Sequence, residues 1–104
     1  MAESKTDSFK DFVLDQLSGI EGVTARAMFG GHGIYCGKTF FGILWRGRLF
    51  LKTNDRTRSA YEDRGMKPFA PNQRQTLKNY LEVPADVVER GDELCRWAHQ
   101  SCAT

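Results

Sequence analysis

The stretch Arg26-Ala-Met-Phe-Gly-Gly-His-Gly-Ile-Tyr35 constrains this chain more than any other, because it holds three glycines between two segments of alternating apolar residues. Glycine reaches positive φ without a clash at Cβ, so a glycine cluster lets one strand end and the next begin within very little chain. Such a cluster between two alternating segments is typical of a hairpin. Gly30, Gly31 and Gly33 therefore predict a structural turn between two antiparallel strands.

An amphipathic helix is predicted ahead of this turn, because apolar residues recur there at helical spacing and form one stripe. The stripe consists of Phe9, Phe12, Val13, Leu17 and Ile20. We expect residues 1–7 to form a flexible tail, Ser8 to cap the helix, and Gly19 or Gly22 to end it.

Four strands joined by glycine-containing turns are predicted next, which is the pattern of an antiparallel meander. They span residues 23–29, 34–36, 39–45 and 48–52. A weak helix then starts at Asn54 or Asp55 and ends near Gly65. Residues 66–75 contain Pro68 and Pro71 and are predicted as an irregular edge segment.

The C-terminal part predicts one more strand, over residues 75–83, then a short helical turn near Val88 and a last helix capped by Asp92. The element order is therefore α-β-β-β-β-α-β-α-α. Because most strands and helices are segregated, the fold class is α+β: a two-layer sandwich in which an antiparallel sheet of about five strands has its helices on one face. Residues 1–104 make a single domain, since a chain of 104 residues supports one packed core.

Three segments resemble the N-terminal domain of the TfoX/Sxy family of competence regulators. They are Met28-Phe-Gly-Gly-His-Gly-Ile-Tyr35, Arg48-Leu-Phe-Leu-Lys52 and Tyr80-Leu-Glu-Val-Pro84. The opening Phe9-Lys-Asp-Phe-Val-Leu-Asp-Gln-Leu17 and the closing Asp92-Glu-Leu-Cys-Arg-Trp-Ala98 are similar to that family as well. The resemblance implies a two-layer sandwich with a mostly antiparallel sheet.

The same resemblance implies a regulatory role without enzymatic activity. The best-known members are bacterial positive regulators of DNA-uptake genes that act with a cyclic-AMP receptor protein. We therefore expect a non-catalytic domain that works through protein–protein contacts, with a transcription factor of the cyclic-AMP receptor protein type or a polymerase as partner, and with a sheet edge that could pair two copies into a homodimer. Full-length regulators carry a second, C-terminal helical domain similar to helix–hairpin–helix modules, and we expect this chain, ending at Thr104, to lack it.

Arg46, Arg48 and Lys52 share strand parity and predict a basic stripe, with Trp45 and Phe50 nearby. Such a stripe can dock an acidic protein surface or track a phosphate backbone, while a solvated sheet face with edge charges is the simpler alternative. The net charge of +2 is too small to single out nucleic acid. We take the three residues as the candidate interaction surface and direct nucleic-acid binding as the alternative function.

Two further patterns lack the context that their chemistry requires. The glycine stretch joins two strands and has no Lys-Ser/Thr, whereas a phosphate-binding loop leads into a helix. His32 with Cys36, and Cys95 with His99, are each spaced to share a face, so the four side chains could bind a metal or a small ligand if they converge. Because zinc sites show tighter local spacing and no third group orients a Cys/His nucleophile, we assign no catalytic residue, cofactor or metal.

Composition predicts a cytoplasmic protein. No apolar run approaches the roughly 18 residues of a membrane span, and the polar first residues do not form a secretory signal. Three cysteines, an odd count without a CxxC pair, suit a reducing compartment.

Overall fold

The structure, a computed structural model, describes residues 5–28, 30–72 and 74–102. In this part of the chain, four helices accompany one six-stranded sheet with the strand order β1-β2-β3-β4-β6-β5. All neighbouring strands are antiparallel, which confirms the predicted α+β class. The elements are α1 (Lys5–Gln16), β1 (Val23–Met28), β2 (Gly31–Cys36), β3 (Thr39–Trp45), β4 (Arg48–Lys52), α2 (Arg58–Glu62), β5 (Pro68–Asn72), β6 (Gln75–Glu82), α3 (Ala85–Val88) and α4 (Gly91–Cys102).

The sheet contains one strand more than the sequence predicted. This strand, β5, lies within the segment 66–75 that was expected to be irregular. Proline lacks the N–H that a ladder needs, but an edge strand tolerates it because only one of its sides must pair. β5 takes that edge position beside β6, and its register shifts on both sides of Phe69. The element order is thus α-β-β-β-β-α-β-β-α-α.

The first helix starts and ends earlier than predicted. α1 begins at Lys5, so Ser8 lies inside the helix rather than at its cap, and residues 5–7 are helical. It ends at Gln16, ahead of both Gly19 and Gly22. The remaining residues of the expected N-terminal tail, 1–4, lie outside the described part of the chain.

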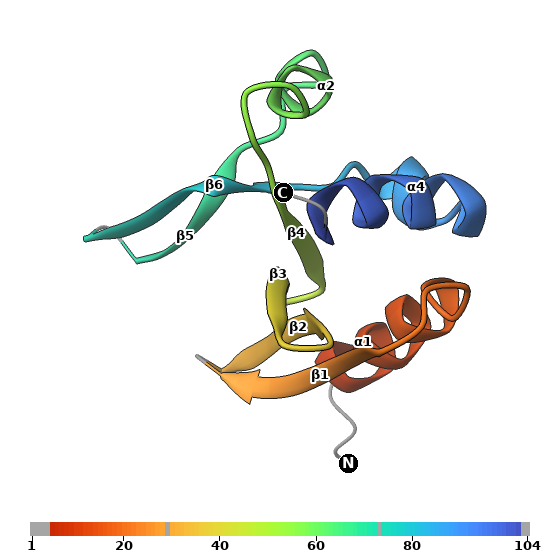
Figure 1. Cartoon of the computed structure of the whole chain (residues 1–104). Helices are drawn as coiled ribbons and strands as arrows, with labels where there is room; N and C mark the ends of the chain where they lie inside the picture. The colour runs from red at the N-terminus through yellow and green to blue at the C-terminus, as the bar shows by residue number, and fades with distance from the viewer. Residues whose placement is uncertain (1–4, 29, 73, 103–104) are drawn as a thin grey trace.

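Both faces of the sheet carry apolar side chains, and the helices cover only one of them. Figure 1 shows α1 and α4 on the same side of the sheet. The larger core cluster lies between the helices and the sheet, and its members include Val13, Leu17, Ile34, Phe41, Leu44, Leu49, Leu51, Leu94 and Ala98. A smaller cluster of Ile43, Phe50 and Phe69 lies on the opposite side, which we call the helix-free face.

A bulge in β3 lets this strand serve both clusters. Ile34 of β2 pairs with Gly42 and Tyr35 pairs with Phe40, so Phe41 is an extra residue on β3. Phe41 is fully buried in the larger cluster, and Gly42 beside it also faces that side, against the Leu51 side chain. The bulge thus places two consecutive residues under the helices while Phe40 stays on the helix-free face.

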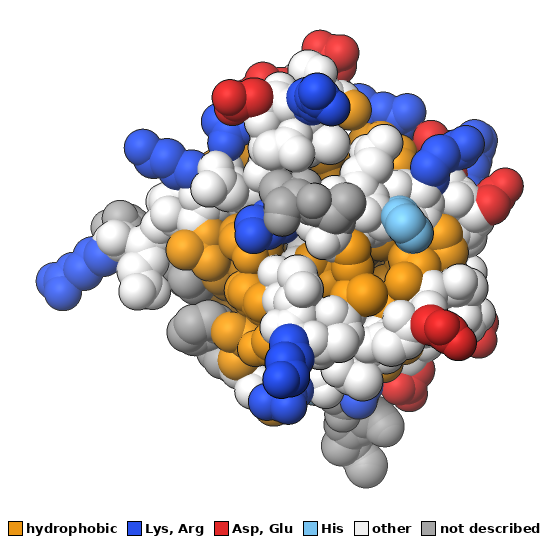
Figure 2. All heavy atoms as spheres, in the orientation of Figure 1, with side chains coloured by type: hydrophobic (Ala, Val, Ile, Leu, Met, Phe, Trp, Pro, Cys, Tyr) orange, Lys and Arg blue, Asp and Glu red, His pale blue; other side chains and the backbone are white. Residues whose placement is uncertain are grey.

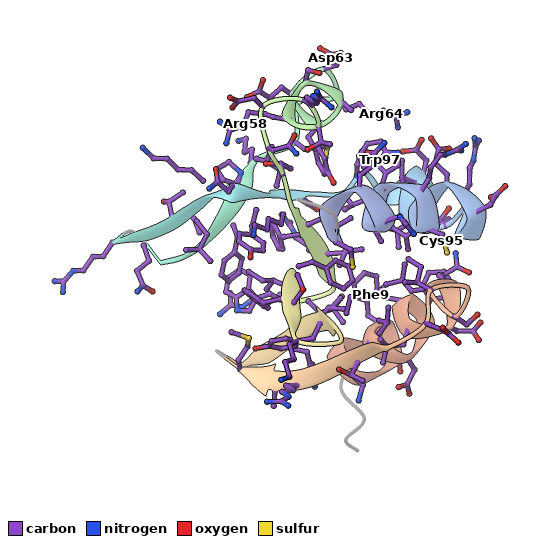
Figure 3. The ribbon with its side chains drawn as sticks, viewed as in Figure 1. Phe9, Arg58, Asp63, Arg64, Cys95 and Trp97 are labelled. Carbon is purple, nitrogen blue, oxygen red and sulfur yellow. The ribbon has the colours of Figure 1, made fainter. Side chains whose placement is uncertain are left out.

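The short helix α2 is fixed by aromatic packing. The ring centroids of Tyr61 in α2 and Trp97 in α4 lie 4.7 Å apart, and the Tyr61 side chain is buried. Burial raises the pKa of Tyr61 well above its usual value, more than the hydrogen bond with Ser101 lowers it. Figure 3 shows Trp97 on the side of α4 that faces α2, and Cys95 on the side that faces α1.

Candidate functional site

The three glycines of the predicted turn have different structural roles. Gly30 adopts a φ of +77°, as a tight turn requires, whereas Gly31 and Gly33 lie inside β2. A Cβ at Gly31 would collide with the carbonyl oxygen of Leu44, and one at Gly33 would collide with the Met28 sulfur. Other atoms of the protein therefore fill the space beside both glycines of β2, which leaves no room there for a ligand.

The predicted basic stripe is divided between the two ends of β4. Arg46 lies in the turn before β4 with a φ of 52°, so it does not share the strand parity that the sequence suggested. Its guanidinium carbon lies 4.6 Å from the centroid of the Trp45 ring. Arg48 and Lys52 stand at opposite ends of β4 and alternate with Leu49 and Leu51, whose side chains enter the larger core cluster. Arg48 and Lys52 therefore belong to the helix-free face.

Arg48 borders an apolar groove where β3 turns into β4. The groove encloses about 250 Å³, and Phe9, Phe12, Leu49 and Val88 are among its apolar lining residues. Phe12 is 42% exposed, although it belongs to the stripe that predicted a buried helix face. At the rim of the groove, an Arg48 guanidinium nitrogen lies 3.5 Å from a Glu82 carboxylate oxygen. This site combines an apolar floor with a charged rim.

Three half-buried rings from three strands form a row on the helix-free face. The Tyr35 and Phe40 ring centroids are 5.2 Å apart, and those of Phe40 and Tyr80 are 5.4 Å apart. We call Tyr35, Phe40 and Tyr80 the aromatic row. Burial raises the pKa of Tyr80, and the nearby Tyr35 raises it further. Figure 2 shows hydrophobic side chains gathered between the β5–β6 hairpin and the β1–β2 hairpin, with Lys and Arg side chains around them.

The predicted cysteine candidates make contacts in separate places, whereas the buried Nδ1 atom of His32 in β2 has no hydrogen-bond partner and His99 in α4 is exposed. The Cys95 thiol donates a hydrogen bond to the Gln16 carbonyl oxygen at 3.2 Å, which joins α4 to α1. The Cys36 thiol lies 3.8 Å from the Glu21 carbonyl oxygen and also contacts Cys102, whose pKa is raised to about 12, mainly by burial. Among the described residues, no group of three or more His, Cys, Asp or Glu side chains is arranged to hold a metal ion.

These observations define a small α+β domain with helices on one side of an antiparallel sheet, a groove at the end of β4 and an aromatic row on the helix-free face. Residues 15–104 match the family model of the TfoX N-terminal domain, so the chain belongs to that family, as the sequence predicted. No curated protein matches the chain. In the parts of the chain that the structure describes, no helix has both the length and the apolar character needed to cross a membrane.

Proposed function

We propose that this domain is a non-catalytic interaction module that acts in transcription regulation by binding a protein partner through the groove beside Arg48. Membership of the TfoX N-terminal domain family supports a role in the control of DNA-uptake genes. The partner is a transcription factor of the cyclic-AMP receptor protein type or a polymerase subunit. This role places the domain in the cytoplasm, a reducing compartment that suits its three free cysteines.

The observation that carries this proposal is the exposure of Phe12 at the groove. A large aromatic side chain that is 42% exposed beside an apolar depression is typical of a docking surface, since aromatic anchors in pockets supply most of the binding energy of protein interfaces. A volume of about 250 Å³ accepts one large apolar side chain of the partner.

The charged rim adds a requirement on the partner. The Arg48 side chain is 62% exposed, and its 3.5 Å contact with Glu82 is too long for a strong hydrogen bond. Its guanidinium group therefore keeps donors for a carboxylate, and Arg46 in the adjoining turn adds a second positive charge. The expected docking segment carries an apolar side chain flanked by an acidic residue.

Binding of purified cyclic-AMP receptor protein and RNA polymerase from the host, measured by calorimetry, tests this proposal. Phe12→Ser and Arg48→Glu should each weaken binding about tenfold or more. Leu77→Ser is the matched control, because Leu77 is also a large, exposed apolar residue but lies on β6, away from the groove. Equal affinity of the wild type and both groove variants would contradict the assignment of the groove.

We also propose that two copies of the chain can pair through the outer edge of β1. β1 pairs with β2 alone among the described strands, so its other edge is available for a second copy. Light scattering of the purified chain, with and without Ala25→Pro in β1, distinguishes a dimer formed at this edge from a monomer, because proline removes an edge donor.

A further inference from the structure

The aromatic row and the groove lie at opposite ends of β4. Lys52, the last residue of β4, is the register partner of Tyr80, whereas Arg48 begins the strand at the groove. A strand rises roughly 3.3 Å per residue, so the two ends of β4 are separated by about 13 Å. The row is thus a second surface, and its properties do not depend on the partner proposed for the groove.

Positive charge flanks the row. The Arg26 guanidinium carbon lies 5.4 Å from the centroid of the Tyr35 ring, and Arg26 is exposed. Lys52 is the register partner of Tyr80 and shares its face, on the strand between Phe40 and Tyr80. Among the described residues that face this side of β1, β2, β3, β4 and β6, Glu82 is the single carboxylate, and it is paired with Arg48. The surroundings of the row therefore favour an anionic ligand.

The shape of the row adds a preference for flat ligands. Its neighbouring rings are spaced 5.2 and 5.4 Å apart across three strands and remain half-buried, so part of each ring is open to solvent. Shielding the smaller core cluster would need only apolar side chains. The arginine stacked on Tyr35 adds a charged group that such shielding does not require.

We propose that the aromatic row binds single-stranded nucleic acid, with bases stacked on Tyr35, Phe40 and Tyr80 and with phosphates held by Arg26 and Lys52. Aromatic rings on an open sheet face combined with nearby cations are the chemistry by which proteins hold unpaired strands, because every base has a π face and every linkage has a negative charge. A duplex keeps its bases stacked inside, where the rings have no access to them. Single-stranded DNA and single-stranded RNA share the recognised chemistry.

Fluorescence anisotropy with labelled oligothymidine and oligouridine of about 20 nucleotides, alongside a duplex of the same length, tests the proposal. We expect both single strands to bind more tightly than the duplex. Tyr35→Ala should weaken binding roughly 5- to 150-fold, which corresponds to the stacking energy of one base, while Tyr35→Phe stays within about twofold. With two phosphate contacts, the slope of log K against log salt should be about −1.4 for a single strand.

Two charge-reversal variants distinguish binding at the aromatic row from a general electrostatic attraction to the protein. Arg26→Glu should weaken binding, whereas Arg96→Glu, at an exposed position on α4, should leave it unchanged. Circular dichroism of each variant reports whether it is folded, and the exposed Arg26 can be changed even if Tyr35→Ala proves unstable. Phe12→Ser should retain nucleic-acid binding, so failure at the groove and failure at the row give different results.

Three outcomes would overturn the proposal. The first is that neither oligonucleotide binds at about 50 mM salt, where phosphate contacts are strongest. The second is an equal loss of binding in Arg26→Glu and Arg96→Glu, which would show a diffuse electrostatic attraction. The third is binding of polyglutamate without binding of either oligonucleotide, which would make the row a docking site for an acidic protein.

Discussion

Glycine is required at Gly31 and at Gly37 for different physical reasons. Gly37 has a φ of +62° with no atom within 4 Å of an added Cβ, so only its backbone conformation demands glycine. At Gly31, an added Cβ would strike the carbonyl oxygen of Leu44, which belongs to the neighbouring strand and has little freedom to move. The first requirement concerns conformation, and the second concerns space between β2 and β3.

Alanine substitutions should separate these two requirements. Gly37→Ala should lower the free energy of unfolding by about 1–2 kcal/mol, the usual penalty of a left-handed alanine. Gly31→Ala should lower it by about 3 kcal/mol, because the ladder between β2 and β3 must shift. Urea unfolding of both variants measures the difference, and equal midpoints would show that Gly31 is not under steric constraint.

Tyr61 should make the stability of the protein fall at alkaline pH. Its pKa is raised in the folded state, so its contribution is complete below the unfolded pKa of about 10 and is lost as the pH rises above that value. The slope attributable to this one group approaches about 1.4 kcal/mol per pH unit. Tyr61→Phe keeps the ring against Trp97 but has no titrating group, so urea unfolding between about pH 9 and 11 should show a smaller decline in this variant. Parallel curves for the two proteins would contradict the prediction.

At the scale of elements, β5 is held by one side chain more than by its ladder. Its pairing with β6 is irregular, but Phe69 is 1% exposed and makes edge-to-face contacts with Phe50 at 5.1 Å and Trp45 at 5.3 Å between ring centroids. These contacts anchor the edge strand to β3 and β4. The hairpin that β5 forms with β6 therefore depends on the smaller core cluster.

Removal of the Phe69 ring should loosen β5 and destabilise the smaller core cluster. Phe69→Ala should lower the free energy of unfolding by about 3–5 kcal/mol and shift the fluorescence of Trp45 toward that of an exposed indole. Leu77→Ala in the same hairpin is the control, since Leu77 is 38% exposed and its loss should change stability by less than about 1 kcal/mol. Two variants of similar stability would show that the ladder, and not Phe69, fixes β5.

How far the sequence predicts these elements depends on how local their signals are. The strands of the meander and the turn glycine Gly65 follow from patterns within a few residues, and the structure contains them. The two prolines of β5 argued against a strand there. This strand is stabilised by contacts of Phe69 with Trp45 and Phe50, which are distant from it in the sequence. The resemblance to the TfoX family was likewise visible in short segments, and the family model then matches residues 15–104 as one span.

The candidate site was predictable only in part for a similar reason. Arg48 and Lys52 were identified from strand parity, but Arg46 belongs to the turn and the parity argument fails there. The groove arises where α1, the turn before β4 and α3 converge, so no single segment indicates it. Alternation along the sequence does not predict the aromatic row, because the bulge at Phe41 changes which residues of β3 face each side of the sheet.

In the molecule as a whole, the two core clusters lie on opposite sides of the same strands. Trp97 packs against the larger cluster and Trp45 against the smaller one. β3 and β4 supply side chains to both clusters, so neither cluster can be lost while the other keeps its strands in place. The domain should therefore unfold as one cooperative unit.

Two single-tryptophan variants test this cooperativity. Trp45→Phe leaves Trp97 as the reporter of the larger cluster, and Trp97→Phe leaves Trp45 as the reporter of the smaller one. Within each variant, the urea transition measured by fluorescence should coincide with the transition measured by circular dichroism. If the Trp45 signal changes before the circular dichroism does, the helix-free side of the domain unfolds separately.

The bulge at Phe41 also determines where this chain can change its length. Ile34 faces Gly42 and Tyr35 faces Phe40, so loss of Phe41 alone would leave the residues on both sides in their present alignment with β2. Loss of a residue of β3 outside the bulge, such as Leu44, would instead reverse the two sides of the strand on one flank of the gap. Phe41 thus behaves as an inserted residue, and a variant that lacks it should keep the same ladder around a smaller interior.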